Sequence, residues 1–230
     1  MMTMTAPIII QFDMDDVVTD TNTLFIDELI SALKASTHPM APYLLHHLII
    51  HDNIHTLAFQ ERLRKHAPEM AVVLDEIIKT DIMDKAEYMS NVQPNHQIVA
   101  FIKNVLAKSV ESGRIRLGVT THRGFHVEAK DRTQLWLREQ GIEHLFCEFN
   151  VLDYRTIPNK LTYLREMHGD NFILIDDNPI AGIQLLPHHK ELVIFTNGRK
   201  HLNRYTNQAI VNNERELQAH LTELGVIGYY

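Results

Sequence analysis

The sequence predicts an α/β fold, a Rossmann-like parallel sheet with helices on both faces and a helical cap inserted after the first strand. Three observations support this class. A dense apolar run, residues 8–12, lies near the start of the chain. Strand-like and helix-like patterns alternate from residue 92 onward, as they do in parallel sheets. The residues between these two regions show helical spacing only.

The first predicted strand contains Ile8, Ile9, Ile10 and Phe12. A run this apolar is typical of a strand that is buried on both faces of a parallel sheet. It is followed at once by the acidic segment 13–16. We therefore expect this strand to deliver carboxylates to the carboxyl end of the sheet.

Residues 21–91 are predicted to form the helical cap. Apolar residues recur at helical spacing in TNTLFIDELISALKA, YLLHHLIIHDNIHTLAFQERLRKH and EMAVVLDEIIKTDIMDKAEYM. Prolines in THPMAP and HAPE separate these stretches. The predicted division is a catalytic core of residues 1–20 and 92–230, with the cap inserted as residues 21–91.

The remainder of the chain alternates between helix and strand. We predict helices at HQIVAFIKNVLAKSVES, 128–140, 158–168 and NERELQAHLTEL, and strands at 116–120, 144–149, FILID and ELVIFT. Gly141 stands at the expected stop of the second of these helices. Such alternation predicts right-handed crossovers that cover both faces of one sheet.

Composition narrows the classes of function. Of the 230 residues, 45% are hydrophobic and 22% charged, with a formal net charge of −7. Long nucleic acid is not an expected partner, because binding it usually requires a clustered basic face. The single cysteine, Cys147, allows no internal disulfide and fits a reducing compartment. The start of the chain does not resemble a signal peptide and no stretch is long enough to cross a bilayer, so we expect a soluble, cytoplasmic protein. Oligomeric state cannot be predicted.

Two acidic clusters are predicted to meet at the carboxyl edge of the sheet. Asp13 and Asp15 follow the first strand on the same side, and Asp176 and Asp177 end the strand FILI. Ligands bind beyond this edge in open parallel sheets. Two such charges about 4 Å apart repel by roughly 4 kcal/mol at an effective dielectric near 20. Carboxylates at this density suit Mg²⁺, which pairs with phosphate substrates.

The segment FDMDDVVTDT resembles the first motif of the haloacid dehalogenase-like superfamily, and FILIDDNP resembles its fourth. The resemblance implies a phosphatase with a C1-type cap. In it, Asp13 is the nucleophile and Asp15 the general acid/base, while Asp176 and Asp177 hold Mg²⁺ together with Asp13 and the backbone carbonyl of Asp15. An acid/base role asks for a raised pKa at Asp15, which acidic neighbours would favour.

The second and third motifs of this family have shorter counterparts. IRLGVT resembles the second motif, which implies that the Thr120 hydroxyl, or alternatively that of Thr121, donates to the phosphoryl group. Lys160, which begins KLTYLREM, is placed like the lysine of the third motif. The chain departs from the family at Asp16, where glycine is usual. The segment THRG adds Arg123, a candidate for substrate binding or for an ordinary surface or capping role.

The histidines offer a competing metal site. His47, His51 and His55 are spaced i, i+4, i+8, which would place them on one helix face where they could bind zinc. The apolar residues among them favour a different interpretation, the polar face of an amphipathic helix in the cap.

The function that this resemblance implies is Mg²⁺-dependent hydrolysis of a small phosphorylated metabolite through an aspartyl-phosphate. Alternatives are a phosphomutase, a metal-free dehalogenase and a catalytically silent binding protein on the same fold. A weaker similarity to 5′(3′)-deoxyribonucleotidases suggests a nucleotide substrate. Phe25, Tyr43 and Phe59 are then candidates for contact with a base, although each could equally pack within the cap.

Overall fold

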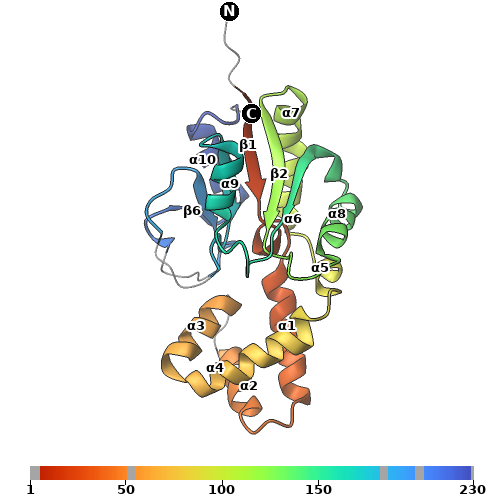
Figure 1. Cartoon of the computed structure of the whole chain (residues 1–230), viewed down its shortest axis with the longest axis vertical. Coiled ribbons are helices and arrows are strands. Elements are labelled where there is room, and N and C mark those ends of the chain that lie inside the picture. The colour runs from red at the N-terminus through yellow and green to blue at the C-terminus, as the bar shows by residue number, and fades with distance from the viewer. Residues whose placement is uncertain (1–5, 51–54, 182–185, 200–204, 229–230) are drawn as a thin grey trace, which may run out of the picture.

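The structure is a computed structural model that describes residues 6–50, 55–181, 186–199 and 205–228. Its centre is a parallel sheet with the strand order β3-β2-β1-β4-β5-β6 (Figure 1). The strands are β1 (Ile8–Phe12), β2 (Ile115–Thr121), β3 (Phe146–Val151), β4 (Phe172–Asp176), β5 (Leu192–Phe195) and β6 (Ala209–Val211). The α/β class with a Rossmann-like parallel sheet is therefore confirmed.

The predicted strands differ from the observed ones in two places. The strand expected at 144–149 begins later, because residues 143–145 form a short helical turn, η4 (Glu143–Leu145), before β3. The edge strand β6 was not predicted. Its apolar run, AIV, is only three residues long, which is too short to show a strand's alternation, and its middle residue, Ile210, is exposed.

Helices cover both faces of the sheet. Those that follow the block 21–91 are α6 (His96–Phe101), η3 (Ile102–Leu106), α7 (Ala107–Glu111), α8 (Ala129–Glu139), α9 (Lys160–His168) and α10 (Glu214–Glu223). Ile10 and Phe12 share a core with α6, η3, α8 and α10. Ile9 faces the other way and packs with α9. The alternation along β1 thus matches the period of two expected for a strand that is covered on both faces.

The described part of residues 21–91 is helical, as predicted, and contains no strand. Its helices are α1 (Thr21–Ala35), α2 (Ala41–Ile50), α3 (Thr56–His66), α4 (Pro68–Ile77), η2 (Ile78–Met83) and α5 (Tyr88–Asn91). We call these residues the helical block. They form a hydrophobic cluster largely of their own, and Figure 1 shows α1–α4 beyond the carboxyl ends of β1 and β2.

The chain passes between the sheet and the helical block twice, and the two crossings are hydrogen-bonded to each other. The Asp20 amide donates to the Gln93 carbonyl at 2.8 Å, and the Asn95 amide donates to the Val18 carbonyl at 2.9 Å. Trp136 of α8 donates its indole N–H to the carbonyl of Val92 at 2.9 Å. The second crossing is thereby attached to a helix of the sheet layer.

The histidine spacing does not fall on a single helix. α2 ends at Ile50, and His55 is the N-cap residue of α3. His47 lies on the exposed side of α2, and His51 lies outside the described residues. The three-histidine zinc site is therefore not formed by one helix face as its spacing suggested.

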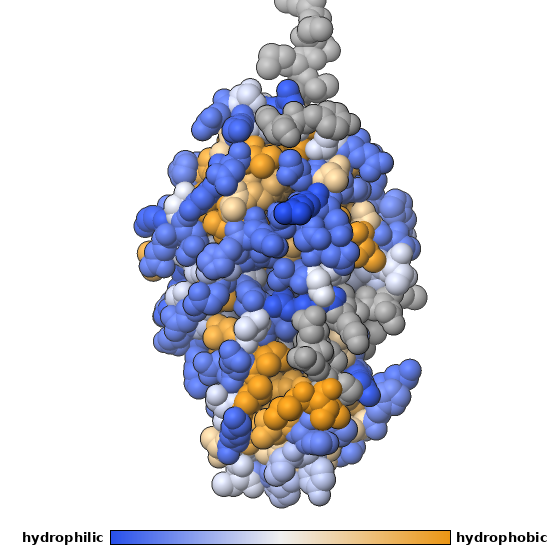
Figure 2. Space-filling view, turned by 180° about the vertical axis from the view of Figure 1, so that it is seen from behind, coloured by the Kyte–Doolittle hydropathy of each residue, from blue (hydrophilic) through white to orange (hydrophobic). Residues whose placement is uncertain are grey.

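The surface of the helical block carries apolar side chains. Figure 2 shows an apolar patch over the end of the molecule that the block forms. The exposed large apolar residues of the block are Tyr43, Ile49, Ile50 and Val72. Among the described helices, none has the length and apolar content that crossing a bilayer requires.

Candidate active site

The candidate site lies where β1 and β4 end side by side. Asp13 follows β1 directly, and its amide donates to the Ile175 carbonyl of β4 at 2.9 Å. Asp176 is the last residue of β4, and Asp177 follows it. Asp13, Asp176 and Asp177 are all buried. The parallel pairing of β1 with β4 therefore brings the two predicted acidic clusters together.

Lys160 lies between the two clusters. It is the first residue of α9, behind the N-cap Asn159, and only 1% of it is exposed. Its Nζ is 3.1 Å from Asp13 Oδ1 and 2.8 Å from Asp176 Oδ2. Burial would lower the pKa of Lys160, but Asp13 and Asp176 outweigh it and raise that pKa, so the ammonium stays charged.

The carboxylates of Asp13, Asp176 and Asp177 fit a divalent cation. One oxygen from each lies within 4.8 Å of the others. Asp13 Oδ1 is buried and, within the described part of the chain, accepts no hydrogen bond of good geometry. Burial raises the pKa of Asp13 well above its usual value, against the charge of Lys160, and Asp176 adds to the rise. A cation beside Asp13 would offset this cost and favour its ionised form.

Asp15 is held by Arg123. The guanidinium donates from Nε to Asp15 Oδ2 at 2.9 Å and from Nη2 to Oδ1 at 2.6 Å, and Thr21 Oγ1 donates to Oδ1 at 2.6 Å. Burial would raise the pKa of Asp15, but Arg123 and Thr21 outweigh it and lower that pKa. The raised pKa expected from acidic neighbours is therefore wrong for this arrangement, because the expectation left out Arg123.

Of the roles predicted for Arg123, the surface role does not apply. It is fully buried, so it is not a surface residue, and its Nη1 donates to the Met89 carbonyl at 3.4 Å. Its guanidinium carbon lies 6.0 Å from the centre of the Tyr88 ring. Two of its three nitrogens donate to Asp15. A contact of Arg123 with substrate stays a prediction.

The geometry distinguishes the two threonines at the end of β2. Thr120 Oγ1 donates to Gln11 Oε1 at 3.0 Å and accepts from Asn150 Nδ2 at 3.2 Å, so its one proton is engaged. Thr121 Oγ1 is buried and, among the described residues, has no hydrogen-bond partner. Thr121 therefore has a proton to offer, whereas Thr120 lies on the face of the sheet that carries Gln11. The choice between them as the phosphoryl contact stays a prediction.

Asp16 and His55 form a contact that the sequence did not predict. Asp16 has a φ of 60°, the left-handed region where glycine is the easiest residue and where aspartate is tolerated. His55 Nε2 lies 3.1 Å from Asp16 Oδ2 and 3.3 Å from Asp177 Oδ2. Arg199 approaches the opposite oxygen of Asp16 at 3.3 Å and also pairs with Asp20. The residue that departs from the family pattern thus binds the helical block.

A cavity of about 420 Å³ opens above these groups. Asp13, Asp15, Lys160 and Asp177 lie among its lining residues. Its apolar wall consists of Phe25, Leu29, Leu57, Ile78, Met83, Tyr88, Phe125, Tyr154 and Ala181. Of the three aromatic residues singled out from the sequence, only Phe25 lines the cavity. Tyr43 is exposed and Phe59 is buried in the cluster of the helical block.

Solved structures share this architecture. A predicted phosphatase from Clostridium acetobutylicum aligns over 95% of this chain and 100% of its own, with a TM-score of 0.55 and 16% sequence identity. A predicted phosphoglycolate phosphatase from Haemophilus somnus aligns over 94% and 98%, at 0.52 and 14%. A HAD family hydrolase from Deinococcus radiodurans, with bound phosphate and sodium, aligns over 98% and 100%, at 0.50 and 16%.

The fold is that of the haloacid dehalogenase-like hydrolases. No family model matches the sequence, and no curated protein matches it significantly. At sequence identities this low, the likeness to these structures shows the fold of the chain and not its activity. The haloacid dehalogenase-like fold nevertheless agrees with the motif resemblance, since residues 13, 160, 176 and 177 meet at one point of it.

Proposed function

We propose that this chain is a Mg²⁺-dependent phosphomonoester hydrolase that acts through an aspartyl-phosphate on Asp13. The proposal depends chiefly on one observation. Asp13 is buried at the end of β1 beside Lys160, and one of its carboxylate oxygens belongs to a cluster that fits a divalent cation. The low-identity likeness to proteins described as phosphatases is consistent with this chemistry.

In the proposed reaction a carboxylate oxygen of Asp13 attacks phosphorus, and the bond from phosphorus to the leaving oxygen breaks. Asp15 gives a proton to that oxygen. Asp15 then takes a proton from water, whose oxygen attacks phosphorus and releases phosphate and free Asp13. Lys160 and the hydroxyl of Thr121 stabilise charge on the phosphoryl oxygens. Mg²⁺ held by Asp13, Asp176, Asp177 and the carbonyl of Asp15 would supply further positive charge.

The pair between Asp15 and Arg123 belongs to this cycle. It favours the ionised carboxylate, which is the form that accepts a proton from water. Donation to the leaving group requires the protonated form. A bound phosphoryl group that attracts the Arg123 guanidinium would weaken the contact between Arg123 and Asp15. The pKa of the Asp15 carboxyl would then rise.

The cavity supports a substrate with one phosphate and an apolar or aromatic body. Its wall includes the ring pair Phe25 and Tyr88, with centroids 5.4 Å apart, and the pair Phe125 and Tyr154, 5.9 Å apart. Arg64, another cation of the described lining, is paired with Asp75 at 3.0 Å and is not poised for a second anion. Nucleoside or aryl monophosphates fit this lining better than phosphoglycolate, a small substrate with a second anionic group.

The test measures phosphate release from an aryl monophosphate and a nucleoside monophosphate, with Mg²⁺, after chelation, and after Mg²⁺ is restored. Activity should vanish on chelation and return with Mg²⁺. Asp13→Asn, which preserves shape, should abolish turnover while the protein still melts cooperatively. Turnover by the folded variant within a few-fold of the parent would contradict the nucleophile assignment. Full activity without divalent metal would contradict the metal assignment.

A further inference from the structure

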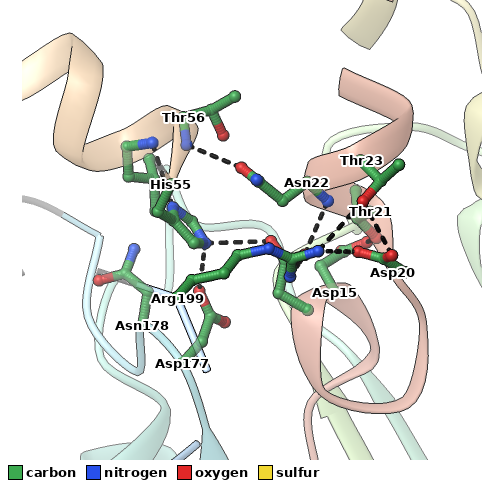
Figure 3. A network of polar contacts seen from close by, with 12 residues as sticks. Asp15, Asp20, Thr21, Asn22, Thr23, His55, Thr56, Asp177, Asn178 and Arg199 are labelled. Atoms are coloured by element: carbon green, nitrogen blue, oxygen red, sulfur yellow. Dashed lines mark hydrogen bonds and ion pairs between the residues drawn. The ribbon is translucent and has the colours of Figure 1, made fainter. Parts of the chain in front are cut away.

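His55 connects the helical block to a carboxylate of the candidate metal site. It comes from the N-cap of α3, whereas Asp16 and Asp177 follow β1 and β4. Its ring is 2% exposed and Nε2 lies within 3.3 Å of an oxygen on each carboxylate. Figure 3 shows the imidazole reaching from the start of α3 toward Asp177.

The other ring nitrogen determines what Nε2 can do. Nδ1 of His55 accepts the Leu57 amide at 3.2 Å, the hydrogen bond that caps α3. An acceptor nitrogen carries no proton, so the neutral ring has its proton on Nε2. Nε2 therefore donates to Asp16 and Asp177. Binding a metal through Nε2 would shift the ring proton to Nδ1. There it would face the amide hydrogen of Leu57, and the hydrogen bond that caps α3 would be lost. The group Asp16, His55 and Asp177 is thus poorly suited to hold a second metal ion.

Further bonds fix the histidine in place. The Thr56 amide donates to Asn22 Oδ1 at 2.7 Å, and the Asn22 amide donates to Asp16 Oδ1 at 2.7 Å. The start of α3 is thereby joined to the start of α1 and to the loop after β1. His55 can reach Asp177 only while the helical block is seated at the carboxyl end of the sheet.

We propose that His55, supported by Asp16, is a positioning residue that orients Asp177 for metal binding and so links seating of the helical block to completion of the metal site. This rests on the proposed function, in which Asp177 is a metal ligand. Groups that hold metal ligands in place commonly change metal affinity about 10–100-fold when removed. Asp16 contacts the same Nε2 of His55 that contacts Asp177. Loss of Asp16 should therefore weaken metal binding by releasing His55.

Calorimetric titration of the folded, metal-free protein with Mg²⁺ tests the proposal. His55→Asn keeps an N-cap side chain that can accept the Leu57 amide but is too short to reach Asp177. It should weaken Mg²⁺ binding about tenfold. Asp16→Gly, which suits the positive φ, should give a similar loss, and the double variant should add little to either. His47→Asn, an exposed histidine of the same block, is the matched control and should bind as the parent does.

The outcomes are distinguishable. The parent should bind one Mg²⁺ and Asp177→Asn should bind far more weakly. If the parent binds none, the proposed function fails, and the positioning role of His55 fails with it. If Asp177→Asn lowers affinity while folded His55→Asn binds as tightly as the parent, only the positioning role is overturned. A stoichiometry of two, reduced to one by His55→Asn, would overturn it in favour of a second metal site. A lower melting temperature of His55→Asn with unchanged Mg²⁺ affinity would show that His55 stabilises the fold without positioning Asp177, and would overturn the proposal.

Discussion

At the scale of single residues, the end of β2 offers a matched pair for testing which hydroxyl serves the phosphoryl group. Thr121→Val removes the buried hydroxyl that has no partner among the described residues. If this hydroxyl donates to the reacting phosphoryl group, turnover should fall by roughly 10²-fold or more, with little change in stability. Steady-state kinetics and thermal melting check both parts.

Thr120→Val is the control for that experiment. It leaves Gln11 Oε1 without its donor in a buried position. We expect a loss of about 1–3 kcal/mol in the free energy of unfolding and a smaller effect on turnover. The reverse pattern, with Thr120→Val the more damaging to turnover, would restore Thr120 as the phosphoryl contact.

His122 should make stability depend on pH. Burial lowers its pKa to about 3, helped by the charge of Lys160, while Nε2 donates to the Ile157 carbonyl at 2.9 Å. Between this value and the ordinary pKa of about 6.5, the unfolded chain binds a proton that the folded protein does not. Stability contributed by neutral His122 is therefore present above about pH 6.5 and is lost as pH falls toward 3.

Denaturant titrations at about pH 6 and pH 5 measure this effect. The parent should lose roughly 1 kcal/mol more per pH unit than His122→Gln, whose amide can still donate to Ile157. The exposed His47→Gln variant should follow the parent. Equal pH dependence in the parent and His122→Gln would show that His122 is not the titrating group.

The sequence could identify some site residues and not others, for a physical reason. Asp13, Asp176 and Asp177 follow apolar strands, and parallel strands place their carboxyl ends at one edge. Arg123 meets Asp15 across 108 residues of sequence, and His55 meets Asp16 across 39. Those contacts depend on how the helical block and the loop after β2 are placed. No local pattern of apolar and polar residues encodes that placement.

At the scale of elements, the central strands and long helices were predictable because burial on one or two faces leaves a periodic pattern. The short edge strand β6 leaves none. The histidine spacing around His47 suggests one helix face, but this stretch contains the end of α2 and the start of α3. Helix boundaries of this kind depend on capping, here by His55, a residue outside the usual capping types.

Removal of the helical block tests its proposed role as a cap. The hydrogen bond between Asp20 and Gln93 shows that the two crossings lie side by side, so a short Gly/Ser linker can replace residues 21–91. The shortened protein should hydrolyse a small aryl phosphate slowly and lose its preference among larger monophosphates. Its basal rate should also fall, because Thr21 and the Met89 carbonyl no longer support Asp15 and Arg123.

Interpretation of that experiment requires a soluble, cooperatively folded product, since the deletion uncovers apolar surface. Gel filtration and circular dichroism provide the control. If the folded core keeps the parent's ranking of substrates, the helical block does not select them. Selection would then come from the loops that carry Phe125 and Tyr154.

At the scale of the whole molecule, metal binding should appear as stability. A ligand that binds only the folded state at about 100 times its Kd adds roughly 2.7 kcal/mol. For a chain of this size that corresponds to a rise of about 5–10 °C in Tm. Mg²⁺ should produce this rise in the parent and not in Asp177→Asn. Ca²⁺ should also raise Tm but fail to support turnover, because its larger and looser coordination shell misplaces the attacking carboxylate. An unchanged Tm at saturating Mg²⁺ would contradict the site.

The single tryptophan of the chain provides an intrinsic fluorescence probe. Trp136 is the only one in the chain, is 2% exposed, and bonds through its indole N–H to the second crossing at Val92. A swing of the helical block that displaces Val92 would strain or break that bond, and water reaching the indole would shift its emission to longer wavelength. Stopped-flow fluorescence could therefore time such a motion against product formation without an attached dye.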